Sequence, residues 1–259
     1  MDRKAALLNS EPSPPEYETF LSHAGKQLEA EEIRQVQEKD AARTAAGKSI
    51  IAMSSGLPNA QGFPIIEADF RLRDGSVLHL DEEQMNIASN YGPTAGYVPL
   101  REWLLKLQKQ EHQPPQLTRP NHPEGFKLAV TAGAFDGLRS FIYCLMDKED
   151  SIILEDEVYC SVTSMVKLHG SAVPISHDDK GVLVDDLEEL MSTWPQKYPD
   201  RPRPKALYAI TAGNNPRGYN WTEDRMVDIY LLCRKHNLLI IEDGAYYFMQ
   251  FGQVRNTVK

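Results

Sequence analysis

Four short stretches carry side chains that could hold a flat, phosphorylated ligand. They read TAGAFDG (131–137), EDEVY (155–159), TAGNNPRG (211–218) and EDGAYY (242–247). The first opens a predicted helix, so its free backbone N–H groups and the positive end of the helix dipole suit a phosphate. The others supply a phenol, an amide, and a carboxylate with a second phenol close behind it. Together these groups could surround a planar ring.

Each of these side chains has a binding interpretation and a structural one. Tyr159 could stack on a flat ring, or it could be a packing aromatic residue. Asn215, before Pro216 in a rigid turn, could donate its amide to a ring oxygen, or it could form an Asx turn. Asp243 could accept a charge-assisted bond from a protonated ring nitrogen, or it could cap a strand. Tyr246 could reach the same oxygen as Asn215. Their order and spacing favour the binding interpretation.

The elements around these stretches alternate between strands and helices. Apolar runs predict strands at 126–131, 151–156, 172–176, 205–211 and 238–243. Helical periodicity predicts helices at 134–146, 160–170, 184–194 and 222–237, with Thr222 as the N-cap of the last. This alternation predicts an α/β fold with a parallel-rich sheet and helices on both faces. Ligands of such sheets lie at the carboxyl ends of the strands, where these stretches fall.

The composition changes along the chain and indicates four segments. Residues 1–50 form a Pro-rich and charged N-terminal arm with a candidate surface helix, and residues 51–125 form loop-rich entry segments with a helix at 99–110. Residues 126–251 carry the alternating pattern, and residues 252–259 are a polar tail.

Charge and composition exclude several functional classes. The net charge of −9 disfavours binding to nucleic acid or to an anionic membrane. No apolar run approaches the ~18 residues that span a bilayer, and no signal peptide is evident. The three cysteines are widely spaced and suit a reducing compartment, and no histidine has metal-ligand spacing, so no metal is expected. We expect a cytoplasmic protein, with a mitochondrial location as the open alternative.

Further motifs indicate a family. SSGLPNAQGFP (54–64), YGPTAGYVPLREWL (91–104), GNNPRG (213–218) and IIEDGAYYFMQF (240–251) together span roughly residues 50–251. The chain resembles the N-terminal part of fold-type I pyridoxal-phosphate-dependent aminotransferases of class I/II. It is most similar to the group of kynurenine/α-aminoadipate and fungal aromatic aminotransferases. The resemblance implies that residues 126–251 are an incomplete large domain that binds pyridoxal 5'-phosphate.

The resemblance also implies roles for the candidate residues. Asp243 would hold the pyridinium nitrogen, Asn215 and Tyr246 the phenolate oxygen, and Tyr159 would stack on the ring. Tyr91 would approach the cofactor phosphate from a partner subunit, which implies a homodimer, and residues 51–125 would form the substrate and dimer side. The remaining implied contacts are Gly133, Ala134 and Phe135 for the phosphate and Gly56 and Leu57 for the substrate.

The implied reaction is amino transfer from an aromatic, kynurenine-like or 2-aminoadipate-like amino acid to a 2-oxo acid. The chain as given lacks the family's Schiff-base lysine and small domain, so no catalytic residue is assigned and we expect it to be inactive alone. Ala134 and Phe135 also stand where relatives have hydroxyl or amide side chains. The alternative is therefore a non-catalytic, truncated relative that acts as a binding or dimerisation partner. A nicotinamide-binding oxidoreductase is rejected, because TAGAFDG is not a G-x-G-x-x-G turn.

Overall fold

The chain forms two compact units in the computed structural model. The first comprises residues 1–28 and 131–259, and the second comprises residues 29–130. The structure describes residues 17–29, 31–51, 53, 56–114 and 126–249. The Pro-rich opening, the connection at 115–125 and the polar tail at 252–259 lie outside the described residues.

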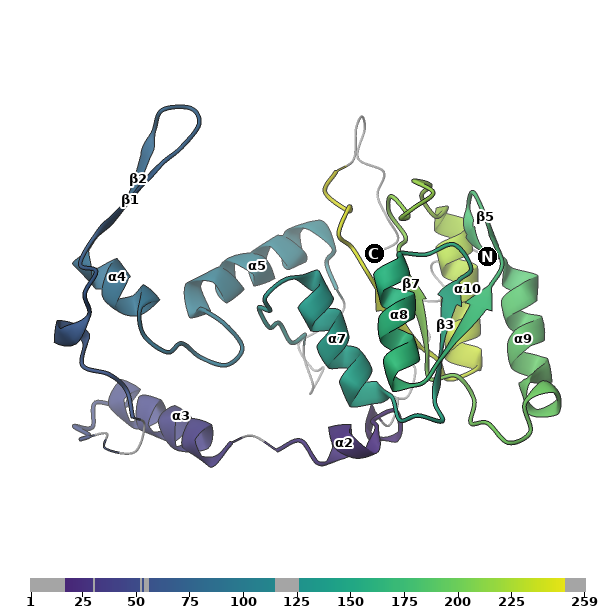
Figure 1. The fold of residues 1–259 in the computed structure, drawn as a ribbon, viewed down its shortest axis with the longest axis horizontal. Helices are drawn as coiled ribbons and strands as arrows, with labels where there is room; N and C mark the ends of the chain where they lie inside the picture. The colour runs from purple at the N-terminus through teal and green to yellow at the C-terminus, as the bar shows by residue number, and fades with distance from the viewer. Residues whose placement is uncertain (1–16, 30, 52, 54–55, 115–125, 250–259) are drawn as a thin grey trace. The chain divides into compact units, whose positions relative to one another are not determined.

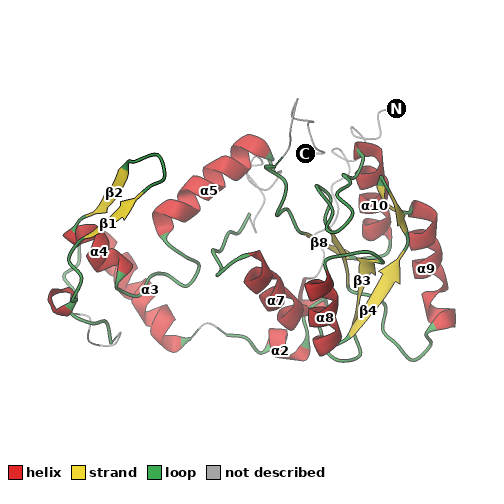
Figure 2. Cartoon of the chain, turned by 45° about the horizontal axis from the view of Figure 1, so that its top comes forward, coloured by secondary structure: helices red, strands yellow, loops and turns green. Residues whose placement is uncertain are grey.

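A parallel four-stranded sheet forms the centre of the first unit (Figure 2). The strands lie in the order β4 (Ser171–Ile175), β3 (Ser151–Glu155), β7 (Ala206–Ala209) and β8 (Leu239–Glu242). In the register, Ile153 lies opposite both Val173 and Leu207, and Leu207 lies opposite Ile240. The predicted α/β class with a parallel-rich sheet is confirmed.

Helices cover both faces of this sheet (Figure 1). One pair is α7 (Ala134–Leu145) and α8 (Cys160–His169), and the other is α9 (Val184–Lys197) and α10 (Glu223–Lys235). Ile152 and Leu154 pack in the buried cluster with α7 and α8, whereas Ile153 packs in the cluster with α9 and α10. Because both faces are buried, β3 is a continuous apolar run instead of alternating with polar residues. The predicted N-cap is confirmed, since Thr222 accepts a hydrogen bond from the Arg225 N–H at 3.4 Å.

Short elements complete the first unit. They are a 3₁₀ turn at Tyr17–Thr19, α2 (His23–Lys26), and the antiparallel pair β5 (His177–Asp178) and β6 (Gly181–Val182). Ser22 joins α2 to α7, because its hydroxyl accepts the Gly25 N–H at 2.9 Å and donates to the Tyr143 carbonyl at 3.0 Å. β8 ends the strand order, and Ile240 on it is 41% exposed.

The second unit contains two longer helices and a hairpin. Its elements are α3 (Glu32–Ala45), a 3₁₀ turn at Ala60–Gly62, β1 (Ala68–Arg71), β2 (Val77–Leu80), α4 (Glu82–Ala88) and α5 (Val98–Glu111). β1 and β2 pair antiparallel. Asp81 and Gln84 begin α4 with a reciprocal capping box. The helices predicted in the N-terminal arm and at 99–110 are confirmed as α3 and α5.

The strand predicted at 126–131 is wrong, because the structure assigns no strand there. The Val130 N–H donates to the Ala95 carbonyl at 2.9 Å, and Arg101 Nε donates to the Leu128 carbonyl at 3.1 Å. These contacts reach a loop and a helix side chain rather than a neighbouring strand. An extended apolar segment becomes a strand only where another strand can form a ladder with it.

Glu188 provides a pH-dependent contribution to stability that can be measured. Its carboxylate accepts hydrogen bonds from Lys235 Nζ at 2.6 Å, His236 Nε2 at 3.0 Å and the Ser192 hydroxyl at 2.8 Å. The Lys235 contact, followed by those of His236 and Ser192, lowers the pKa of Glu188 from 4.5 to about 2. A lowered carboxyl pKa stabilises the fold above the unfolded value and loses this effect as the pH falls through the folded value.

We therefore expect Glu188→Gln to be less stable than the wild-type chain near neutral pH. The difference should shrink as the pH falls from 4.5 towards 2, because the wild-type carboxylate then becomes protonated. Urea denaturation followed by circular dichroism at a series of pH values measures it. A difference that stays constant across this range would contradict the expectation.

Candidate functional site

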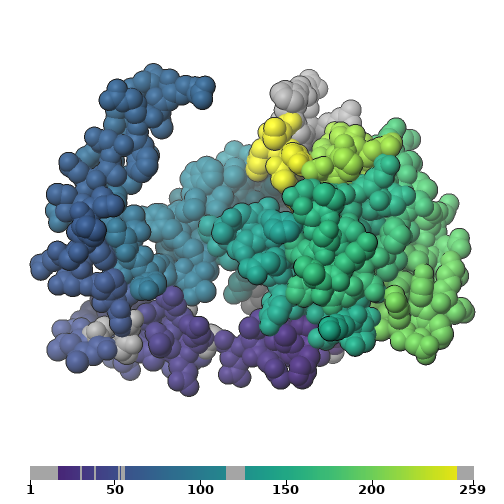
Figure 3. All heavy atoms as spheres, in the orientation of Figure 1, coloured from purple at the N-terminus to yellow at the C-terminus, as the bar shows by residue number. Residues whose placement is uncertain are grey.

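Most of the candidate residues lie at the carboxyl edge of the first unit's sheet. Asp243 directly follows β8, Asn215 lies between β7 and α10, Tyr159 directly precedes α8, and Gly133 directly precedes α7. In Figure 3 the yellow atoms that follow β8 lie against the lime-green atoms of the β7–α10 loop. The central strands β3 and β7 are buried, whereas these residues are half-buried or exposed, so they form a surface to which a ligand has access.

Asn215 and Tyr246 meet at this edge. Asn215 Nδ2 donates to the Tyr246 hydroxyl oxygen at 3.2 Å. Gly213 makes the approach possible: its φ is +63°, and a Cβ there would lie 3.1 Å from Tyr246 Cβ. The second N–H of the amide and the phenol hydrogen are both available as donors to a third acceptor. The pair thus has the geometry to bind one oxygen atom from two sides.

The carboxylate of Asp243 is held in a fixed orientation. Its backbone N–H donates to the Ala209 carbonyl at 2.9 Å and continues the β7–β8 pairing. The Ala245 N–H donates to Oδ1 at 3.2 Å, and the Tyr208 hydroxyl donates to Oδ2 at 2.7 Å. A carboxylate offers about four lone-pair positions, so these two bonds leave capacity for a cationic N–H donor.

Tyr208 is a site residue that the sequence analysis missed. It lies in β7, is only 1% exposed, and places its hydroxyl at the edge of the sheet. Burial raises the pKa of Tyr208 well above its ordinary value, and the hydrogen bond to Asp243 raises it further. The phenol therefore stays protonated and remains a donor. A tyrosine inside a buried apolar strand was the available signal, because its hydroxyl needs a partner.

The turn before α7 combines a helix start with few side-chain donors. Gly133 has a φ of +129°, and α7 begins without a side-chain cap. The Thr131 hydroxyl donates to the Gly133 carbonyl at 2.8 Å. Asp136 accepts the Ala132 N–H at 3.3 Å and a bond from Arg139 at 3.0 Å, and the Arg139 bond is the main cause of a lowered Asp136 pKa. Backbone N–H groups are therefore what this turn offers to an anion.

Two aromatic residues come together beside that turn. The rings of Phe135 and Tyr159 lie in an edge-to-face contact, with centroids 6.5 Å apart and an interplanar angle of 76°. Such contacts contribute about 0.5–1.5 kcal/mol beyond area burial. Phe135 thus helps to fix the orientation of the Tyr159 ring, a contact that the sequence analysis did not predict.

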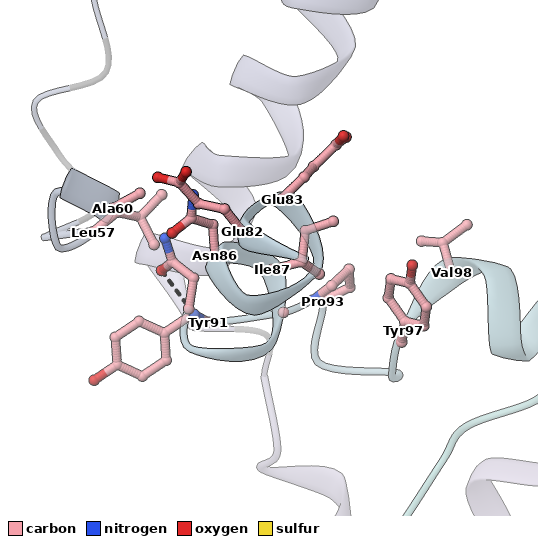
Figure 4. A pocket seen from close by; sticks show the side chains of 12 residues that line it. Leu57, Ala60, Glu82, Glu83, Asn86, Ile87, Tyr91, Pro93, Tyr97 and Val98 are labelled. Carbon is pink, nitrogen blue, oxygen red and sulfur yellow. Dashed lines mark hydrogen bonds between the residues drawn. The ribbon is translucent and has the colours of Figure 1, made fainter. Parts of the chain in front are cut away.

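The other candidate residues belong to the second unit. A hollow of about 770 Å³ is lined by residues that include Leu57, Tyr91 and Tyr97. Figure 4 shows Leu57 near Asn86 of α4 and Tyr97 beside Pro93, with the Tyr91 ring directed away from α4. Gly56 is exposed and does not line this hollow. The grouping of Gly56, Leu57 and Tyr91 with the first-unit residues stays a prediction.

The described part of the chain offers neither a metal cluster nor a membrane-spanning helix. Among those residues, no group of three or more histidine, cysteine or acidic side chains has a metal-binding arrangement. No described helix combines the length and apolar character that crossing a membrane requires.

Comparisons with known proteins show the family. The profile of the family "Aminotransferase class I and II" matches residues 60–259. The chain is 34% identical over 212 residues to a mitochondrial kynurenine/alpha-aminoadipate aminotransferase of Bos taurus, covering 80% of this chain and 50% of that protein. It is 28% identical over 220 residues to an aromatic amino acid aminotransferase of Dictyostelium discoideum, covering 83% and 45% respectively.

The solved structures agree on the fold. Aminotransferase Aro8 from Candida albicans matches with a TM-score of 0.75 and 22% identity, over 93% of this chain and 52% of that one. The chain spans about half the length of the curated relatives it matches. Since the family profile matches most of the sequence, the chain belongs to the class I and II aminotransferases.

Proposed function

We propose that the protein takes part in the transfer of an amino group from an amino acid to a 2-oxo acid, with pyridoxal 5'-phosphate as cofactor. The observation that carries this proposal is the convergence of three groups at the carboxyl edge of the sheet. Asn215 and Tyr246 meet at 3.2 Å, and Tyr208 orients the carboxylate of Asp243 at the end of the neighbouring strand β8. Membership of the aminotransferase family supports the same reaction.

The residues present fit this cofactor. Asp243 has acceptor capacity for a protonated ring nitrogen, and Asn215 and Tyr246 have donors for an oxygen on the ring. The uncapped start of α7 suits a phosphate, and Tyr159 offers an aromatic face. When bound, the cofactor supplies an electron sink for the substrate carbon that loses its proton.

The chain's own residues would then hold and polarise the ring. The Asp243 carboxylate would favour the charged form of the ring nitrogen, because an opposite charge at hydrogen-bond distance stabilises a cation. Asn215 and Tyr246 would stabilise negative charge on the ring oxygen. The backbone of Gly133, Ala134 and Phe135 would bind the phosphate. Because Ala134 and Phe135 lack side-chain donors, we expect weaker retention than hydroxyl or amide side chains would give.

The substrates and the assembly are also proposals. The names of the relatives support an aromatic, kynurenine-like or 2-aminoadipate-like amino donor. We place Gly56 and Leu57 on the substrate side, and we propose a homodimer in which Tyr91 reaches the phosphate of the partner's site. The exposure of Tyr91 supports that role, as do other exposed apolar side chains of the second unit, such as Ile51, Met53, Ile66 and Trp103. A cytoplasmic location is proposed, with mitochondria, named for the bovine relative, as the alternative.

A second candidate function is a binding or dimerisation partner without catalysis of its own. The phosphate turn favours it, because Ala134 and Phe135 offer no side-chain hydrogen bond to an anion. The two candidates differ in whether the chain binds the cofactor.

Equilibrium dialysis of the chain with pyridoxal phosphate tests the proposal. We expect saturable binding, and weaker binding of pyridoxal, which has the same ring without the phosphate. The loss should be appreciable, because a phosphate at a helix start gains both hydrogen bonds and a favourable dipole. Light scattering on the same samples measures the mass of the assembly. Absence of saturable binding would reject the cofactor role, and a dimer that forms without binding would favour the second candidate.

A further inference from the structure

Glu155 is a buried acid that the proposed chemistry does not use. It is the last residue of β3 and is only 1% exposed. Burial raises the pKa of Glu155, while its hydrogen bonds and the nearby His177 act in the opposite direction. A buried carboxyl group at the end of a strand is costly unless donors surround it. Its donors therefore indicate what it does.

Three side chains donate to this carboxylate, and all of them come from one loop. The Tyr219 hydroxyl donates to Oε1 at 2.7 Å, and Trp221 Nε1 donates to the same oxygen at 3.1 Å. Asn214 Nδ2 donates to Oε2 at 2.9 Å. All three donor residues are themselves buried. They lie on both sides of Asn215 in the β7–α10 loop, so Glu155 binds the loop through hydrogen bonds before and after that residue.

The same loop is closed by its own hydrogen bonds. The Asn214 N–H donates to the Tyr219 carbonyl at 2.8 Å, and the Trp221 N–H donates to the Thr211 carbonyl at 2.8 Å. The side-chain oxygen of Asn214 accepts the Arg217 N–H at 3.2 Å. Asn214 therefore links Glu155 to the turn that contains Asn215. A shift of Asn214 would move Asn215 away from Tyr246.

Packing fixes the two aromatic residues of this loop that donate to Glu155. The Tyr219 ring lies 5.2 Å from the His177 ring, and Trp221 packs so closely on Gly181 that a Cβ there would lie 2.5 Å from the indole. These contacts fix the positions of the Tyr219 and Trp221 side chains. The carboxylate then sets the position of Asn214 relative to them.

We propose that Glu155 is a positioning residue for the cofactor site, which holds Asn215 at its contact with Tyr246 by binding Asn214, Tyr219 and Trp221. The role in cofactor binding rests on the proposed function. The positioning itself does not, because the hydrogen bonds that carry it lie within the chain.

Hydrogen exchange tests the positioning without any cofactor. In Glu155→Gln the amide side chain cannot accept all three bonds as the carboxylate does, so the backbone amides within residues 213–218, Pro216 excepted, should exchange faster than in the wild type. Glu242→Gln is the matched control, because Glu242 ends the strand β8 and accepts one bond from Thr211 of the same loop. Faster exchange at 213–218 only in Glu155→Gln supports the proposal. Unchanged exchange in Glu155→Gln, or an equal increase in the control, overturns it.

A double-mutant cycle on pyridoxal phosphate affinity tests whether Glu155 acts through Asn215. We expect Glu155→Gln to weaken binding about 5- to 10-fold, as expected for a misplaced hydrogen-bond donor. In an Asn215→Ala background the same change should have no further effect. An equal loss in both backgrounds would show that Glu155 supports the fold in general, and would overturn the proposal.

Tyr219→Phe is a second test that applies if Glu155→Gln does not fold. It removes one donor to Glu155 and keeps the ring that packs on His177. We expect a smaller increase in exchange at 213–218 and a smaller loss of affinity that again requires Asn215. No increase in exchange in a folded Tyr219→Phe chain counts against the proposal. If the wild-type chain binds no cofactor but the exchange results hold, the proposed function fails and the positioning by Glu155 stands.

Discussion

Asp243→Asn is expected to bind pyridoxal phosphate roughly 10- to 100-fold more weakly than the wild-type chain, as follows from losing a hydrogen bond between charged groups. Asparagine preserves the size of the side chain and can still accept the Tyr208 bond through its oxygen. It removes the negative charge that would favour a protonated ring nitrogen. Equilibrium dialysis at neutral pH measures the change in affinity.

Two variants separate the charge of Asp243 from its orientation. Tyr208→Phe keeps the carboxylate and removes the 2.7 Å hydrogen bond to Oδ2, so its effect should be smaller than that of Asp243→Asn. Glu242→Gln removes an adjacent negative charge without touching the Asp243 contacts and should leave the affinity unchanged. An Asp243→Asn chain with wild-type affinity would contradict the role given to this residue. Binding of the ring would then depend on the Asn215–Tyr246 pair and on the aromatic face of Tyr159.

The long elements of the first unit could be predicted because their patterns extend over many residues. The strands around Ile153 and Leu207 are uninterrupted apolar runs, and the helices between them have clear periodicity. The hairpins β1–β2 and β5–β6 were missed, because β1 and β2 are mostly exposed and form no buried apolar run, and β5 and β6 have only two residues each. The segment 126–131 has a strand-like composition, but composition cannot supply the neighbouring strand that a ladder requires.

The site was predictable only in part, for a related reason. Asp243 and Asn215 follow strands, so the rule for parallel sheets places them at one edge. The contacts of Tyr208 with Asp243, and of Glu155 with the β7–α10 loop, depend on β7 lying between β3 and β8. That strand order follows from long-range packing and not from the local pattern. The roles of the individual cofactor contacts remain predictions.

Trp194→Ala is expected to lower the free energy of unfolding of the first unit by about 3–5 kcal/mol, the usual range for removing a buried tryptophan. Trp194 is 1% exposed in α9, and its ring packs 4.4 Å from that of Tyr198. Its Nε1 also donates to the Pro202 carbonyl at 3.1 Å. Alanine would leave a cavity beside the sheet and an unpaired carbonyl. Guanidinium denaturation followed by far-ultraviolet circular dichroism measures the loss.

Leu168→Ala is the control, because Leu168 lies in α8 of the same unit and is 80% exposed. We expect a change within about 0.5 kcal/mol for this variant, as for most surface substitutions. Equal losses in the two variants would show that burial in the α9 cluster is not the cause. Trp194 packs in a buried cluster that contains none of the proposed cofactor residues, so folded Trp194→Ala should keep its affinity for pyridoxal phosphate. Asp243→Asn should show the reverse, with weakened binding and little change in stability, because stability resides in the covered faces of the sheet and binding at its exposed edge.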